Sequence, residues 1–167
     1  PKMVAIVRSW DKAGTEGAGK YSAGVKMGRD EKGRYWILDV ERGQWGATRR
    51  EENIRKTAEK DGDEVPVLLE IEGGSGGKES GENTQRSTLA GFRTVTFHPT
   101  GDKETRAYSF ASQAGAGNVY VLQRHWTQAY INELRYFPYG RYSDQTDATG
   151  AAFNYLSRKK RKIGAMW

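Results

Sequence analysis

The N-terminal stretch Met3–Asp11 is a continuous hydrophobic run that ends in an acid. Five apolar residues in a row precede two polar residues, a tryptophan and the aspartate. Such a run before a glycine-rich segment predicts a β-strand buried on both faces, which is typical of the middle of a sheet. The edge at which such a strand ends is where open α/β sheets bind ligands. Asp11 is therefore the first candidate site residue.

Two further strands are predicted close to the first. Residues 21–29 alternate in polarity, with Ala23, Val25 and Met27 on one face. Residues 34–42 form the next strand after the hairpin turn Asp30–Gly33, which ends in glycine. Three successive strands joined by turns predict an antiparallel meander.

Helices and strands alternate in the rest of the chain. Thr48 and Glu51 have the spacing of a capping box, and Asp102 and Ser143 are candidate caps of later helices. The pattern predicts helices over residues 48–60, 79–90, 102–114, 125–137 and 143–157, and strands over 65–72, 93–98 and 118–122. This order is typical of the α/β class with a mixed sheet. Crossover handedness places the fourth strand parallel to the first and beside it.

Further acids reach the same sheet edge in this arrangement. Glu70 and Glu72 end the predicted fourth strand on one face, and Asp144 and Asp147 share a face at the start of the last helix. Each pair has an ordinary explanation, as solvated strand-end acids or as acids favoured by the helix dipole. Together with Asp11, they predict a carboxylate cluster. Such a cluster can hold two divalent cations about 3.5–4 Å apart, which activate water for phosphodiester hydrolysis.

The amino-acid composition limits the kinds of metal site and binding partner that the chain can have. The 167 residues indicate one domain, with no cysteine and only two histidines. Thiolate metal sites are thus excluded and a histidine-based zinc site is disfavoured, whereas oxygen ligands suit Mg²⁺ or Mn²⁺. The net charge of +6 favours a polyanionic partner, above all nucleic acid. No apolar run approaches the roughly 20 residues that span a bilayer, and no signal peptide is visible, so we expect neither a membrane nor a secreted protein.

One phosphate-binding motif is incomplete. Gly14–Lys20 matches G-x-x-x-x-G-K, but Tyr21 follows where a P-loop needs serine or threonine. The segment also leads into a predicted strand instead of a helix. We therefore reject a P-loop and assign this chain no ATPase activity.

Eight segments follow one another in an order that resembles the C-terminal nuclease domain of phage and prophage terminase large subunits. They cover nearly the whole chain and are SWD at Ser9–Asp11, YSAGVKMGR at Tyr21–Arg29, ILDVERGQW at Ile37–Trp45, EIEGGSGGKES at Glu70–Ser80, GDKETRA at Gly101–Ala107, GNVYVL at Gly117–Leu122, NELRYFPYG at Asn132–Gly140 and SDQTDA at Ser143–Ala148.

The resemblance implies an RNase H-like (retroviral-integrase-like) fold, with a mixed five-stranded sheet flanked by helices and the antiparallel meander first. It implies a nuclease domain over residues 1–157 and a basic tail over 158–167. The implied activity is metal-dependent cleavage of concatemeric double-stranded DNA during phage packaging, with two Mg²⁺ or Mn²⁺ ions. The implied partners are an N-terminal ATPase domain, a small terminase subunit and a portal protein, in the host-cell cytoplasm.

By the same resemblance, the catalytic acids are Asp11, Glu72 and Asp144, and the metal ligands also include Glu70 and Asp147. We favour Glu72 over Glu70 as the second acid because it is nearer the predicted strand end and the glycine loop. Tyr142 and Ser143 stand where the family often has an aspartate or a His–Asp pair, so the number of carboxylates at the second metal stays open. The candidate DNA contacts are Lys78, Lys103, Arg106, Arg158, Lys159 and Lys160.

Two other functions compete with this one. A basic DNA-binding module could keep the fold without the chemistry, but it has no reason to gather carboxylates in a basic protein. Another RNase H-like nuclease, such as a junction resolvase, would share the acids. The order of the motifs disfavours it.

Overall fold

The computed structural model describes residues 1–13 and 19–158 and is built on one mixed sheet. The sheet has six strands in the order β5-β4-β1-β2-β3-β6. The pattern along the chain predicts all six, whereas the resemblance implied a five-stranded sheet; the short β6, predicted over residues 118–122, adds the sixth by pairing in parallel with β3 at one edge. The strands are β1 (Met3–Asp11), β2 (Ser22–Asp30), β3 (Tyr35–Gly43), β4 (Val67–Glu70), β5 (Thr94–Phe97) and β6 (Val119–Val121).

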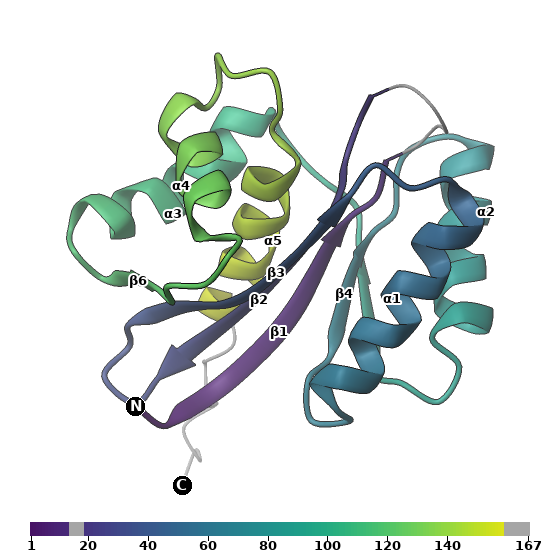
Figure 1. Ribbon diagram of the computed structural model, residues 1–167, viewed down its shortest axis with the longest axis horizontal. Coiled ribbons are helices and arrows are strands. Elements are labelled where there is room, and N and C mark those ends of the chain that lie inside the picture. Colours follow the sequence, from purple (N-terminus) through teal and green to yellow (C-terminus); the bar gives the residue numbers. More distant parts are fainter. Residues whose placement is uncertain (14–18, 159–167) are drawn as a thin grey trace, which may run out of the picture.

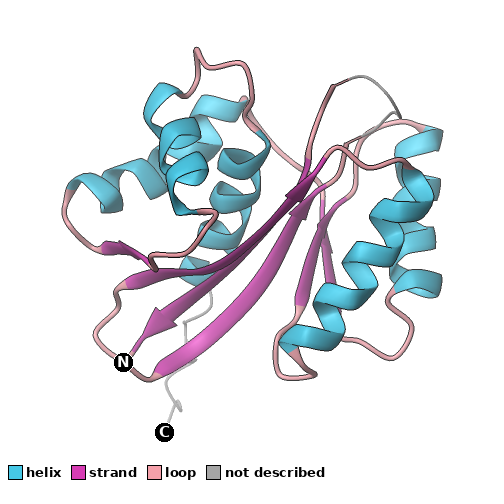
Figure 2. Cartoon of the chain, in the orientation of Figure 1, coloured by secondary structure: helices cyan, strands magenta, loops and turns pink. Residues whose placement is uncertain are grey.

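Helices cover both faces of the sheet. Figure 1 shows α3, α4 and α5 on one side and α1 and α2 on the other, and Figure 2 shows the strands between these two groups. The helices are α1 (Ala47–Asp61), α2 (Ser75–Asn83), the π-helical turn η1 (Thr84–Thr88), α3 (Lys103–Gly115), α4 (Thr127–Tyr136) and α5 (Asp144–Arg158). Within the described ranges, no helix has both the length and the apolar character needed to cross a bilayer.

The meander and the crossover were predicted correctly. β1 pairs with β2, and β2 with β3, in antiparallel register. β4 lies parallel beside β1, with Ser9 opposite Leu68 and Trp10 opposite Leu69. The carboxyl ends of β1 and β4 therefore meet at one edge of the sheet, as the alternation of helices and strands predicted.

Of three helix starts predicted from the sequence, one is confirmed and two are wrong. Asp102 caps α3 by accepting a hydrogen bond of 2.7 Å from the backbone N–H of Thr105. The capping box at Thr48 is wrong, because α1 begins one residue earlier and Gly46 at its cap position provides no side-chain bond. The helix expected from residue 79 begins at Ser75, so the glycine-rich segment after β4 is largely helical.

Each face of the sheet has its own hydrophobic core. The side with α5 buries Val7, Val25, Met27, Ile37, Leu68, Phe110, Tyr130, Ala152 and Phe153, among others. The side with α1 buries Trp10, Ile54, Ala58, Val67, Leu69 and Leu89. Neighbouring residues of β1 and of β4 thus serve opposite cores, as the alternation of side chains along a strand requires.

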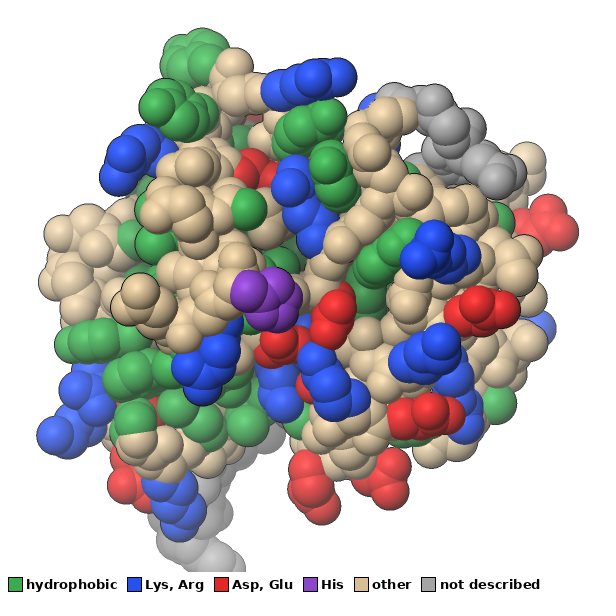
Figure 3. Space-filling model, in the orientation of Figure 1, with side chains coloured by type: hydrophobic (Ala, Val, Ile, Leu, Met, Phe, Trp, Pro, Cys, Tyr) green, Lys and Arg blue, Asp and Glu red, His purple; other side chains and the backbone are tan. Residues whose placement is uncertain are grey.

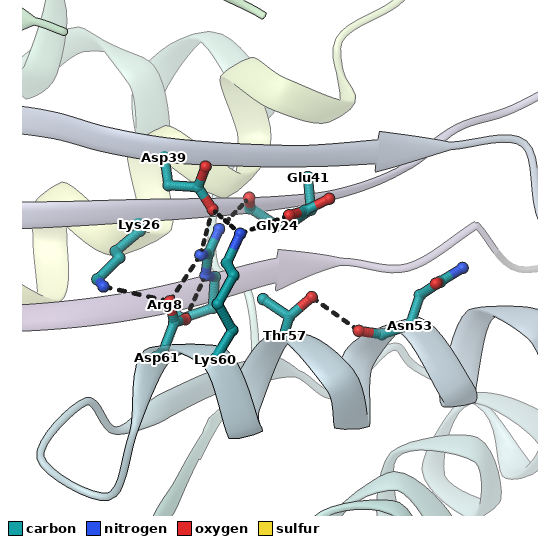
Figure 4. A network of polar contacts seen from close by, with 9 residues as sticks. All are labelled: Arg8, Gly24, Lys26, Asp39, Glu41, Asn53, Thr57, Lys60 and Asp61. Carbon is teal, nitrogen blue, oxygen red and sulfur yellow. Dashed lines mark hydrogen bonds and ion pairs between the residues drawn. The ribbon is translucent and has the colours of Figure 1, made fainter. Parts of the chain in front are cut away.

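A buried arginine joins β1 to α1 and β3. The Arg8 side chain is completely buried and donates to Asp61 at 2.7 and 2.9 Å and to Asp39 at 2.6 Å. It also donates to the carbonyl oxygen of Gly24 at 2.9 Å. Figure 4 shows this network, with Lys26 and Lys60 completing it. Figure 3 shows acidic and basic side chains close together near the middle of the face seen in this orientation. The network fixes the central strand against α1 and against the meander strands β2 and β3.

We expect Arg8→Met to lower the free energy of unfolding by about 3 kcal/mol, because it strands Asp61 as a buried charge with only Lys26 to offset it. Urea unfolding measures the change. The control is Lys2→Met, which removes the cation of an exposed pair with Glu31 and should leave the midpoint unchanged. Equal stability of the two variants would show that the Arg8 network does not secure the fold.

Candidate active site

Asp11 and Glu70 stand at the adjoining ends of β1 and β4. The pKa of Asp11 is raised well above its ordinary value, first by burial and then by the negative charges of Asp147, Glu70 and Asp144. Burial also raises the pKa of Glu70, with further contributions from Glu72 and Asp147. The structure therefore brings Asp11 into electrostatic contact with an acid of β4 and with both acids of α5.

The first turn of α5 reaches this edge because the helix packs closely on the sheet. Ala148 and Ala152 are buried in the core between α5 and the strands. Gly150 faces α3 so closely that an added Cβ would lie 3.4 Å from the carbonyl oxygen of Arg106. The expected close packing of α5 through small residues is confirmed, and that this packing serves to bring Asp144 and Asp147 to Asp11 stays a prediction.

Three of the four carboxylates face a basic side chain. Lys103 Nζ lies 2.7 Å from Asp147 Oδ2, and Arg42 Nε lies 3.1 Å from Asp144 Oδ2. Arg106 lies at a longer distance, 4.0 Å, from Glu70 Oε1. These cations offset part of the repulsion that gathered carboxylates experience.

The donor chemistry fits divalent cations, although the side chains are not arranged around an ion. In residues 1–13 and 19–158, no three acids or histidines are positioned to hold one metal together. Asp11, Glu70, Asp144 and Asp147 nevertheless supply only oxygen donors, which Mg²⁺ and Mn²⁺ prefer. For Asp11 and Glu70, burial and the neighbouring acids raise the pKa, and a bound cation would offset both effects. These four residues would hold the ions.

The two acids near the end of β4 differ in position. β4 ends at Glu70, so the expectation that Glu70 and Glu72 share one strand is wrong: Glu72 is exposed and lies beyond it. α2 approaches Glu72 so closely that a Cβ on Gly77 would lie 2.7 Å from its carbonyl oxygen. Glu72 still lines a cavity of about 90 Å³ with Asp11 and Glu70. The geometry therefore supports Glu70 as the second acid more than Glu72.

The candidate DNA contacts separate into two groups. Lys103, Arg106 and Arg158 line one cavity together with Glu70 and Asp147. Lys78 is exposed on α2, on the other side of the sheet. The candidates Lys159 and Lys160 lie outside the described residues.

Two residues that hold the acids in place were not predicted. The Arg42 guanidinium stacks 3.7 Å from the ring centre of Tyr21 and contacts Tyr142 at 5.3 Å, while bonding Asp144. Tyr142 thus supports an arginine at a position where an acid was considered. Arg42 shows no sequence signal for this role, because its partner Asp144 is 102 residues away.

The second residue is Glu133, which secures the start of α5. It accepts hydrogen bonds from the Thr146 N–H at 2.7 Å, the Thr146 hydroxyl at 3.0 Å and the Gln145 amide at 3.0 Å. Burial raises its pKa. One signal was available: Glu133 lies three residues after the buried Tyr130, on the apolar stripe of α4.

Comparison with known proteins identifies relatives at the level of family and fold. The family of terminase RNaseH-like domains matches residues 8–156. No curated protein matches the chain significantly in sequence.

Among solved structures, the fowlpox virus resolvase in complex with Holliday junction DNA has a TM-score of 0.59 and 13% identity, over 91% of this chain and 97% of that one. The yeast mitochondrial Holliday junction resolvase Ydc2 has a TM-score of 0.59 and 9% identity, over 93% and 80%. T. thermophilus RuvC has a TM-score of 0.54 and 10% identity, over 90% and 92%. At such identities the likeness shows the fold alone, and the expected RNase H-like fold is confirmed.

We expect Asp11→Asn to raise the melting temperature of the metal-free protein at pH 8 by roughly 2–4 °C, because it removes a buried, repelled charge. Because the pKa of Asp11 is raised in the folded state, its protonated carboxyl contributes fully to stability below the unfolded-state pKa of about 3.9. That contribution is lost as the pH rises through the folded-state pKa. The gain should therefore shrink toward pH 4.

The matched control is Asp102→Asn. Asp102 has a pKa lowered by its bond from Thr105, and asparagine caps a helix equally well, so this variant should gain nothing at pH 8. Calorimetric scans at both pH values measure the difference. A rise in melting temperature that does not depend on pH, or a lower melting temperature at pH 8, would show that charge repulsion does not destabilise the protein at Asp11.

Proposed function

The chain belongs to the family of terminase RNaseH-like domains, and on this premise we propose that it is an endonuclease that hydrolyses phosphodiester bonds of double-stranded DNA with two Mg²⁺ or Mn²⁺ ions. The observation that carries the proposal is the gathering of acids at one edge of the sheet: Asp11 and Glu70 line one cavity, and Glu70 and Asp147 line a second. In keeping with this, the charges of Asp147, Glu70 and Asp144 add to burial in raising the pKa of Asp11. A DNA-binding surface without catalysis gains nothing from such a cluster in a chain of net charge +6.

The acids act as ligands, and the surrounding residues hold them. Asp11, Glu70 and Asp144 are the catalytic acids of this proposal, and Asp147 is a further ligand. Glu72 lies near the same edge and is the alternative to Glu70. Bound divalent cations supply an activated water and stabilise the leaving oxygen. Arg42 and Glu133 fix the first turn of α5, which carries two of the ligands. Lys103 pairs with Asp147 and would become available to a DNA phosphate if a cation took its place there.

The biological setting that we propose is phage DNA packaging. Eight segments in the order of the large-subunit nuclease domain, together with the family match, support a role in cutting concatemeric genomes in the host-cell cytoplasm. The partners proposed with it are a packaging ATPase domain, a small terminase subunit and a portal protein.

Junction resolution is the second candidate function, and the structural neighbours favour it. The resolvases share the fold of this chain, so the substrate must separate the two functions. A synthetic four-way junction and a linear duplex of equal length, offered together with Mn²⁺, provide the comparison. Equal cleavage of both supports the packaging nuclease, whereas paired symmetrical cuts in the junction alone would assign the chain to the resolvases.

We expect the protein to nick and linearise supercoiled plasmid with Mg²⁺ or Mn²⁺, and EDTA to abolish cleavage. Asp11→Asn and Glu70→Gln should each reduce the rate by more than about 100-fold, because each removes a metal ligand. Glu72→Gln should retain most of the activity. Agarose gel electrophoresis of the plasmid forms over time measures the rates.

The matched control is Glu64→Gln, which neutralises an exposed acid between α1 and β4 and should cut like the wild type. Loss of activity in Glu72→Gln with retention in Glu70→Gln would reverse the assignment of the second acid. Full activity of a folded Asp11→Asn protein would contradict the carboxylate mechanism.

A further inference from the structure

A cavity of about 540 Å³ lies between β5, α3 and α5 and shares Glu70 and Asp147 with the acid cluster. Pockets of about 300–1,000 Å³ are typical of small-ligand sites in proteins. Between Asp147 and Arg158, both of which line the cavity, α5 runs for roughly 16 Å at 1.5 Å per residue. The cavity therefore extends well away from the acids.

The lining combines two kinds of side chain. Leu68, Phe97 and Ala151 give it an apolar wall, and Lys103, Arg106 and Arg158 give it three cations. Lys103 and Arg106 stand at the end of the cavity that holds the acids, with which they pair. Arg158 is exposed in the last turn of α5, at the other end. A ligand that fills the cavity thus needs both a flat apolar part and negative charges.

We propose that the cavity holds an unpaired nucleotide of the DNA strand being cut, with its base against the apolar wall and the strand's phosphates near Arg106 and Arg158. This proposal rests on the proposed nuclease function and specifies its substrate. A paired duplex stacks its base faces inside and presents phosphates outward, so it cannot use the apolar wall. An unpaired nucleotide offers an open base face and an anionic backbone together.

The distance between the cations is consistent with a strand. Successive phosphates along one strand of a duplex are about 3.4 Å apart along the axis, so roughly 16 Å corresponds to about four to five nucleotides. Arg158 is then placed to meet the backbone a few nucleotides from the acids. DNA that is locally open beside the cut should accordingly be the preferred substrate.

The test compares two tryptophan substitutions on α3. Ser109→Trp fills the cavity, because Ser109 lines it. Ser112→Trp places the same side chain on the same helix at an exposed position outside the lining. The probes are a fluorescein-labelled eight-nucleotide oligothymidylate and an abasic strand of equal length, which keeps the phosphates and lacks the bases. Fluorescence anisotropy in EDTA measures binding without cleavage.

We expect Ser109→Trp to weaken oligothymidylate binding about tenfold, in the range of one lost base-stacking contact. It should change abasic-strand binding less than twofold, and Ser112→Trp should change neither. Arg158→Gln, which leaves the apolar wall of Leu68, Phe97 and Ala151 unchanged, should weaken both strands about equally. Equal binding of the two strands by the wild type, or wild-type binding by a folded Ser109→Trp protein, would overturn the proposal. Displacement of the probe by micromolar thymidine monophosphate would also overturn it, in favour of a free nucleotide.

Cleavage separates this proposal from the function on which it rests. A duplex with a three-nucleotide bubble should be cut faster than a perfect duplex, and Ser109→Trp should remove the difference. If the wild type cuts plasmid but shows no bubble preference, the cavity assignment fails while the nuclease function stands. If the wild type cuts no DNA with either metal, the nuclease function fails, whatever the oligothymidylate binding.

Discussion

The parallel pairing of β1 with β4 is the constraint on which the site depends. It aligns the carboxyl ends of two buried strands, so that the acid ending each strand reaches the same edge. The register is secured from both faces. Trp10 and Leu69 pack in one core, Val7 and Leu68 in the other, and Arg8 binds β1 to α1 and β3. A shift of one residue would turn Asp11 and Glu70 to opposite faces of the sheet.

This arrangement brings carboxylates close enough together to repel one another. Asp11 is partly buried near three other carboxylates, and basic side chains from β3 and α3 offset part of the repulsion. Rigid support keeps the acids together despite it: Glu133 holds the first turn of α5, and the small residues of that helix let it approach the sheet. A folded protein that keeps an unfavourable cluster of charges at a rigid edge is prepared for cations, since their binding converts repulsion into attraction.

Local patterns predicted the parts of the site that depend on local structure. Asp11 could be found because a long apolar run and an acid are adjacent in the chain, and Asp144 and Asp147 because helix spacing places them on one face. Glu72 was favoured over Glu70 because the strand was expected to run to residue 72, whereas the end of β4 depends on where α2 begins, and the glycines from Gly73 onward suggested a loop. Arg42 and Glu133 were missed because their contacts join β3, α4 and α5, which are distant in sequence. The sixth strand was predicted from its own pattern over residues 118–122, and only the five-stranded sheet that the resemblance implied left it out.

The central claim is that Asp11, Glu70, Asp144 and Asp147 hold two divalent cations. Anomalous diffraction from crystals grown with Mn²⁺ tests it most directly, because manganese positions are located independently of the protein atoms. We predict two manganese peaks about 3.5–4 Å apart, with Asp11 lying between the two peaks. Glu70 and an acid of α5 should be among the other ligands. Fully occupied manganese bound elsewhere, or bound through Glu72 with Glu70 still paired to Arg106, would contradict it.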